Sequence, residues 1–283
     1  MKKEIAWITD STAFITEELK NNPDVYVLPL QINFGKESFE DGVDLNTDQL
    51  YERINKLKEV PTTSQPSVGK FVELFEKLKS KYDKAIAVHI SSELSGTIAS
   101  CKAAAEIAEF EVGIVDSKSM SYAITTLINK GMEFAKKKMS FENIRARLQD
   151  EAQNSENYIL LGSLDQFYKG GRMSGTQYLL GSLLQIKPII QIATDGKFHV
   201  FEKVRSDARA VRRMIELFSE SYNTHKINQL QIMHGNIHAK ALELKEEVLK
   251  LIPNLDIFIG EISSTIGVHA GEGTLAMIWH KEK

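Results

Sequence analysis

Short apolar runs alternate with amphipathic stretches along the first half of the chain. The apolar runs are continuous and partly β-branched, as buried parallel strands are, and they cover Ile5–Ile8, Ala85–Ile90 and Val112–Val115. Helical periodicity is found at Thr47–Leu57, Val68–Lys79, Ser95–Ala108, Tyr122–Lys138 and Phe141–Asn154. This alternation predicts a parallel sheet with helices on both faces. Pro29 interrupts Val25–Phe34, which favours an edge strand or a bent extended segment there.

The pattern changes in the second half, after a glycine-bearing break at Lys169–Ser174. Asp195-Gly196 joins two apolar runs and is a strong hairpin signal. The predicted strands are Tyr158–Gly162, Ile186–Ala193, Phe198–Val204, Gln229–Met233, Asp256–Glu261 and Thr274–Trp279. The predicted helices are Gln177–Leu184, Ala208–Tyr222 and Ala239–Leu251. We therefore predict two α/β domains with a ligand between them: residues 1–162 with a parallel sheet, and residues 163–283 with a mixed, partly antiparallel sheet.

The composition narrows the class of protein. The chain has 283 residues, of which 42% are hydrophobic and 26% charged, enough for a core that needs no disulfide or metal. Its single cysteine, Cys101, excludes an internal disulfide and fits the reducing cytoplasm. No run of about 18 apolar residues occurs, so we expect no membrane-spanning helix. A net charge of −3 and a pI near 6.2 argue against a general nucleic-acid-binding surface.

The candidate chemistry lies in three short polar segments, each next to an apolar run: Pro61–Ser67, Ser91–Thr97 and His269–Thr274. Each offers hydroxyl groups or a histidine, together with free backbone N–H groups at the start of an element. Such groups hold a small anion by hydrogen bonds without a fixed countercharge beside it. If the segments converge, they form one oxyanion-binding cleft. Plainer interpretations stay open, with Ser95 and Ser67 as helix N-caps and His269 as a structural residue in a glycine-bearing turn.

Other polar positions give weaker signals. Asp10–Thr12 and Asp116–Ser119 follow predicted strands and could either line the cleft or cap the next helices, and we favour capping. His234 and His238 are four residues apart, but Gly235-Asn236 marks a turn between them, so no metal site is expected. The chain has neither a phosphate-binding loop nor a dinucleotide fingerprint. Arg172 is expected on an exposed loop, either solvated or facing an acidic or phosphorylated partner.

Many of these segments, taken in order, make the chain resemble the DegV family of bacterial fatty-acid-binding proteins over nearly its whole length. The matching segments are Ile8–Thr12, Pro29-Leu30, Phe39–Asp44, Thr63–Ser67, Ser91–Thr97, Val115–Ser117, Gly170–Arg172, Ile186–Ile189 and His269–Gly271. The resemblance implies a two-domain α/β protein that holds one long-chain fatty acid between its domains.

The resemblance also implies roles for single residues. Thr63 and Ser95 correspond to the residues that bind the carboxylate, and His269 corresponds to the histidine that completes their hydrogen-bond network. Arg172 corresponds to the arginine implicated in docking a kinase. We expect further pocket or loop positions at Thr62, Ser64, Gly96, Thr97 and Gly271. Two departures from the family pattern, Glu272 and Ser121–Ala123, leave the acyl specificity open.

We accordingly predict a cytoplasmic, non-catalytic carrier of a long-chain fatty acid. It would present the carboxylate to a separate ATP-dependent fatty acid kinase subunit, which makes acyl-phosphate for phospholipid synthesis. No cofactor, metal, nucleic acid or membrane insertion is expected. The alternative is an acyl hydrolase or phosphotransferase built on Ser95 and His269, although Leu94–Gly96 lacks the Gly-x-Ser-x-Gly nucleophile elbow. A lipid-responsive interaction protein without a kinase partner is a third reading.

Overall fold

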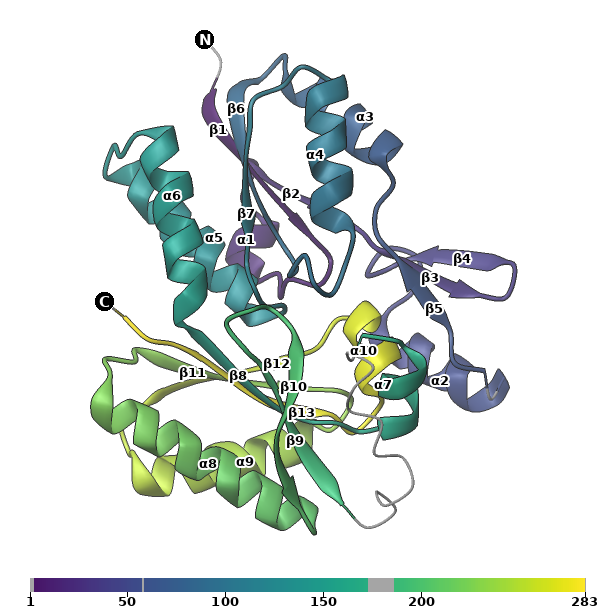
Figure 1. Ribbon diagram of the computed structural model, residues 1–283, viewed down its shortest axis with the longest axis vertical. Coiled ribbons are helices and arrows are strands. Elements are labelled where there is room, and N and C mark those ends of the chain that lie inside the picture. The colour runs from purple at the N-terminus through teal and green to yellow at the C-terminus, as the bar shows by residue number, and fades with distance from the viewer. Residues whose placement is uncertain (1–2, 58, 173–185, 283) are drawn as a thin grey trace.

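A parallel four-stranded sheet forms one half of the molecule (Figure 1). The computed structural model describes residues 3–57, 59–172 and 186–282. The strands lie in the order β2-β1-β6-β7, and their bounds are β1 Lys3–Asp10, β2 Val25–Leu28, β6 Tyr82–His89 and β7 Val112–Asp116. All three pairings are parallel, as the alternation of runs predicts.

Helices cover both faces of this sheet. On one face Phe71, Phe75 and Cys101 pack against Ala6 and Ile8. On the other, a larger cluster joins Trp7 and Ile86 to Ile124, Leu127 and Leu148. The helices concerned are α3 Val68–Leu78, α4 Thr97–Ile107, α5 Tyr122–Lys136 and α6 Phe141–Glu151, which continues into the 3₁₀ turn Ala152–Asn154. Ser67 caps α3, which was one of the open interpretations, and Ser140 caps α6, each accepting a backbone N–H bond.

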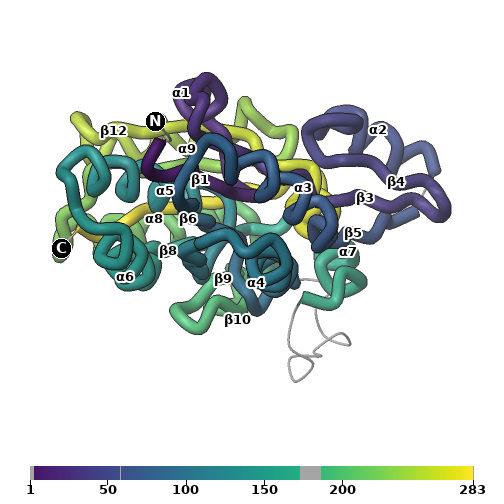
Figure 2. The backbone as a smooth tube through the Cα atoms, turned by 90° about the horizontal axis from the view of Figure 1, so that it is seen from above, coloured from purple at the N-terminus to yellow at the C-terminus, as the bar shows by residue number. Residues whose placement is uncertain are grey.

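Pro29 separates two strands that join different sheets. β2 ends at Leu28 on the edge of the parallel sheet, and β3 begins at Gln31 in a small antiparallel sheet of order β4-β3-β5. The elements of this region are β3 Gln31–Phe34, β4 Glu37–Glu40, α2 Thr47–Leu57 and β5 Thr62–Ser64. Seen from above, α2 and this small sheet lie at one end of the molecule (Figure 2).

The other half of the molecule is a mixed six-stranded sheet of order β10-β9-β8-β13-β11-β12. Its strands are β8 Ser155–Leu160, β9 Lys187–Ile192, β10 Phe198–Val204, β11 Gln229–His234, β12 Asp256–Glu261 and β13 Leu275–His280. β9 and β10 form the predicted antiparallel hairpin. β8 pairs with β13 and β9, so the change of sheet precedes Ser155. The division at residue 162 stays a prediction, but it would cut β8 from its own sheet.

Two long helices pack on one face of the six-stranded sheet, α8 Asp207–Thr224 and α9 His238–Leu251. Their buried partners include Trp279 and Leu230. The opposite face, which carries Ile159 and Ile278, shares the large cluster with α5 and α6. Short helices missing from the predicted set are α1 Glu17–Lys20, α7 Leu164–Lys169 and α10 Ser264–Ala270. The predicted helix Gln177–Leu184 lies outside the described residues. Over the described ranges, no helix is long and apolar enough to cross a membrane.

Candidate functional site

A cavity of about 330 Å³ lies between the two large sheets. Residues that follow strands of the parallel sheet form one side, including Ile90 and Leu94, and residues of β8, β13 and α10 form the other. Ligands of open α/β sheets bind beyond the carboxyl ends of the strands, where this cavity lies. Its volume is within the roughly 300–1,000 Å³ of small-molecule sites.

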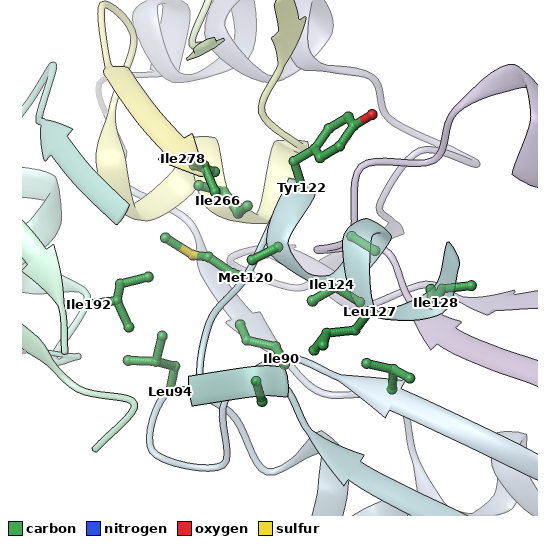
Figure 3. Close-up of a cluster of buried hydrophobic side chains, with 14 of the residues drawn as sticks. Ile90, Leu94, Met120, Tyr122, Ile124, Leu127, Ile128, Ile192, Ile266 and Ile278 are labelled. Atoms are coloured by element: carbon green, nitrogen blue, oxygen red, sulfur yellow. The ribbon is translucent and has the colours of Figure 1, made fainter. Parts of the chain in front are cut away.

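Most of the wall is aliphatic. Figure 3 shows Ile90 and Leu94 from the first half facing Ile266 and Ile278 from the second, with Met120 between them. All five side chains line the cavity. A wall of this kind excludes water and favours an apolar ligand, because each methylene moved out of water contributes about 0.8 kcal/mol.

Polar groups gather at one end of the cavity. Thr63, Ser95 and His269, from three distant segments, all line it, and Oγ1 of Thr63 lies 2.8 Å from Nε2 of His269. Ser64 and Gly96 border the same space, with the Gln65 side chain packed against Gly96. The structure thus brings the three polar segments together. The part that each residue plays toward a ligand stays a prediction.

Thr63 is held by strand pairing. It is the central residue of β5 and pairs with Ile32 of β3, which fixes its side chain toward the cavity. Its neighbour Thr62 is exposed and does not line the cavity, as expected from the alternation of side chains along a strand.

Ser95 does not occupy the N-cap of α4, so the plainer interpretation of this serine is wrong. Gly96 is the N-cap and makes no side-chain capping bond. The Ser95 hydroxyl is 2.9 Å from Oγ1 of Thr97 and accepts a bond from the Thr97 N–H. Thr97 itself is buried and does not line the cavity, but it orients the serine that does.

His269 lies in the last turn of α10, and not in a glycine-bearing turn before the last strand as expected from the sequence. Burial, aided by the charge of Arg172, lowers the pKa of His269 to about 4, so the ring is neutral at pH 7. Nδ1 is buried without a partner among the described residues, and we therefore assign the proton to Nε2. Nε2 then donates to Thr63, whose own hydroxyl proton is free for a ligand oxygen.

Two glycines permit this arrangement of His269. A Cβ at Gly170 would lie 2.3 Å from Nδ1 of His269, so only glycine lets the end of α7 approach the ring. Gly271 ends α10 with φ of +83° and does not line the cavity. A Cβ there would meet Ser163 at 2.5 Å. Its role is to let the chain turn.

Asp41 is a site residue that the sequence did not reveal. It is 3% exposed, and its carboxylate accepts bonds from the N–H groups of Ser264 (3.1 Å) and Thr265 (3.2 Å) and from the Ser11 hydroxyl (2.9 Å). It therefore anchors the first turn of α10, the helix that carries His269. The only available signal was its place in the matching segment Phe39–Asp44.

Arg172 is not on an exposed loop. It is partly buried, lines the cavity, and donates a hydrogen bond to the Gly170 carbonyl. Its charge acts on His269, lowering the pKa of the ring. The expectation of a cleft without a fixed positive charge is therefore wrong, because the structure places a guanidinium at its wall.

The expected helix caps after β1 and β7 are also wrong. Asp10 is buried and accepts a bond from Nδ1 of His89, in the interior of the fold. Asp116 accepts hydrogen bonds from the Ser92 hydroxyl and the Lys118 N–H.

Two further histidine environments lie apart from His269. Burial opposes ionisation of His89, but its hydrogen bonds to Asp10 and Cys101 raise its pKa to about 9. Nε2 of His234 contacts Nδ1 of His238, and the described residues contain no group of metal-ligating side chains.

A family model, curated relatives and solved structures match this chain over nearly its whole length. The family model described as "Uncharacterised protein, DegV family" covers residues 4–282. Protein DegV of Bacillus subtilis is 34% identical over 97% of this chain and 98% of its own. Its crystal structure, described as that of a fatty acid binding protein, covers 99% of both chains with a TM-score of 0.89 at 32% identity.

Two further solved structures share the fold. The fatty acid binding DegV family protein of Streptococcus agalactiae covers both chains fully, with a TM-score of 0.92 at 29% identity. The Fatty Acid Kinase B3 protein of Streptococcus pneumoniae, solved with linoleic acid, covers 99% of this chain and all of its own, with a TM-score of 0.83 at 21% identity. With a family model that spans nearly every residue and a relative above 30% identity, the chain belongs to the DegV family.

Proposed function

We propose that this protein binds one long-chain fatty acid, with the carboxylate at the polar end of the cavity and the tail along its aliphatic wall. The observation that carries the proposal is the Thr63–His269 pair, with Ser95, in a cavity whose wall surface is mostly apolar. A tail of about fifteen methylenes would contribute on the order of 12 kcal/mol before the costs of ordering. The B. subtilis relative described as a fatty acid binding protein supports the assignment.

In this proposal the head group is oriented by hydrogen bonds. The Thr63 and Ser95 hydroxyls donate to the carboxylate oxygens, and the neutral His269 ring fixes the Thr63 hydroxyl. Because Arg172 also lines the cavity, the bound carboxylate is not free of positive charge, and the role of the hydroxyl donors is to orient it.

We further propose that a separate ATP-dependent kinase phosphorylates the bound carboxylate in the cytoplasm. The support is the family resemblance and the position of Arg172 at the cavity wall, after the helix that contacts His269. There Arg172 would meet an acidic or phosphorylated surface of the kinase.

The hydrolase alternative has less support from the geometry. Nε2 of His269 contacts Thr63, and the Ser95 hydroxyl contacts Thr97. Nδ1 of His269 has no acidic partner among the described residues. The described residues therefore do not form the hydrogen-bonded chain of a catalytic triad around Ser95, in which a serine contacts a histidine base and an acid orients that histidine.

Native mass spectrometry of the protein purified from a bacterial host tests the proposal. We expect a co-purified mass of one long-chain fatty acid that denaturation releases. A protein that carries no acyl mass and gains none on incubation with palmitate would contradict the proposal. Ester hydrolysis that disappears in Ser95→Ala would favour the hydrolase instead.

A further inference from the structure

The cavity has a second polar stretch, away from the end formed by Thr63 and His269. Ser121 and Asn157 both line the cavity, and they are 4% and 2% exposed. Met120, next to Ser121 in the chain, and Ile159, two residues after Asn157, also line the cavity. Buried polar groups carry a cost unless they are hydrogen-bonded, so each of them requires an explanation.

Ser121 has a backbone conformation that serine disfavours. Its φ is +59° and its ψ −135°, in a region that glycine enters readily and other residues avoid. Its N–H donates to the Thr12 carbonyl (3.0 Å) and its carbonyl accepts from Ile124 (3.1 Å), which hold it there. Strained residues that the surrounding structure holds in place cluster at functional sites.

Serine is common at helix N-caps because its hydroxyl accepts a hydrogen bond from a backbone N–H of the first turn, but Ser121, the N-cap residue of α5, makes no such bond. No hydrogen bond to this hydroxyl is formed within residues 3–57, 59–172 and 186–282. Ser121 therefore keeps a strained backbone without the benefit of a cap, and its hydroxyl remains available in the cavity wall.

Asn157 is likewise only partly satisfied. Its Nδ2 donates to the Ser119 hydroxyl at 2.8 Å, but its Oδ1 accepts no hydrogen bond from the described residues. Asparagine is disfavoured within strands, and Ile159 of β8 and Leu161 just after it also line the cavity. Because Ser119 is two residues from Ser121, the free hydroxyl and the free amide oxygen belong to one short stretch of wall.

This stretch faces the tail of a bound acid, not its head. Asn157 and Leu160 are separated by about 10 Å of strand. Ser163 lies three residues beyond Leu160, and its N–H donates to the carbonyl of Ala270, the neighbour of His269. At about 1.2 Å per bond, the stretch lies roughly eight or more bonds along an extended acyl chain from the carboxylate.

We propose that Ser121 and Asn157 form a subsite for a hydroxyl group near the middle of the acyl chain, so that the protein selects hydroxylated fatty acids. A ligand hydroxyl donates one hydrogen bond and accepts others. It would donate to Oδ1 of Asn157 and accept from the hydroxyl of Ser121. A plain methylene chain leaves both groups unpaired beneath it, and a site built for a hydroxyl discriminates against such a chain. The inference rests on the proposed function and names its substrate class.

Calorimetric titration of the delipidated protein with four acids tests the inference: stearate, 2-hydroxystearate, 10-hydroxystearate and 12-hydroxystearate. We expect 10- or 12-hydroxystearate to bind about three- to tenfold more tightly than stearate. The 2-hydroxy acid should show no such gain, because its hydroxyl lies at the head group. Equal affinities for stearate and both mid-chain acids would overturn the inference and leave the proposed function standing. Absence of binding by all four acids would overturn both.

Variants separate a ligand role from a structural one. Ser121→Gly removes the hydroxyl and the strain, so we expect the unfolding midpoint to rise by roughly 2–4 °C while the preference for mid-chain hydroxyls disappears. Lys138→Gly is the matched control, since this exposed residue also has positive φ (+58°) but does not line the cavity. It should gain stability and keep the preference. Asn157→Leu should lose the preference without any change at Ser121. Retained preference in both cavity variants would overturn the inference.

Discussion

His269 is neutral at physiological pH because its ring is withdrawn from water beside a guanidinium. Its folded pKa of about 4 is below the ordinary 6.5, so between these values the unfolded chain binds more protons than the folded one. The folded state therefore loses stability as the pH falls through this window, by at most about 1.4 kcal/mol per pH unit from this group.

Urea unfolding of wild type and His269→Gln at pH 7, 6 and 5 measures this contribution. Glutamine cannot titrate, so the free energy of unfolding of wild type should fall relative to the variant as the pH is lowered. A difference that does not change with pH would show that the ring is not held neutral by its surroundings.

Some site residues could be predicted from sequence and others could not. The segments that carry Thr63 and Ser95 were identified because small hydroxyl residues beside apolar runs indicate oxyanion binding. The family resemblance then singled out Thr63 within its segment. The position of Arg172 at the cavity wall was missed, since glycines around an arginine indicate a loop but not what that loop faces. The free hydroxyl of Ser121 was likewise unreadable, because a serine before a helix predicts a cap.

At the scale of elements, α10 depends on Asp41. A carboxylate at a helix N-terminus accepts the unpaired N–H groups of the first turn, and here it comes from the segment after β4. Thr63 is held through β5 and β3, and β3 also pairs with β4. The small sheet therefore positions both partners of the Thr63–His269 hydrogen bond.

Asp41→Asn tests this positioning role. An amide offers one acceptor oxygen in place of two, so α10 should shift and fatty acid affinity should fall about three- to tenfold. The same change in a His269→Ala background should have no further effect, because the role of Asp41 passes through His269. Asp44→Asn is the matched control, an exposed residue of the same segment. If Asp41→Asn lowered fatty acid affinity equally in both backgrounds, Asp41 would stabilise the fold generally and would not act through His269.

Long periodic elements were predictable and short ones were not. Helix α2 spans the predicted Thr47–Leu57, because its apolar spacing continues over several turns. β5 has only three residues between prolines, and its pairing with β3 is a tertiary contact that no local pattern encodes. α10 has seven residues, and Ser263, its capping residue, was the one available sign of a helix.

At the scale of the molecule, the two halves are joined across the cavity. The Ser91 hydroxyl donates to the Gly196 carbonyl at 2.9 Å, and Lys197 forms an ion pair with Glu93. The β9–β10 hairpin thus closes over the segment that carries Ser95. The sequence predicted two α/β halves with a ligand between them. It did not place β8 in the second sheet, because an apolar run does not reveal its pairing partners.

The most direct test of the account is the affinity of the delipidated protein for palmitate in wild type, Thr63→Val, Ser95→Ala and Arg172→Ala. Each lost hydrogen bond to a charged group should cost about 1.5–3 kcal/mol, so Thr63→Val and Ser95→Ala should each weaken binding at least tenfold. Arg172→Ala should still bind palmitate if this residue meets the kinase. Wild-type affinity in both Thr63→Val and Ser95→Ala would contradict the proposed carboxylate site.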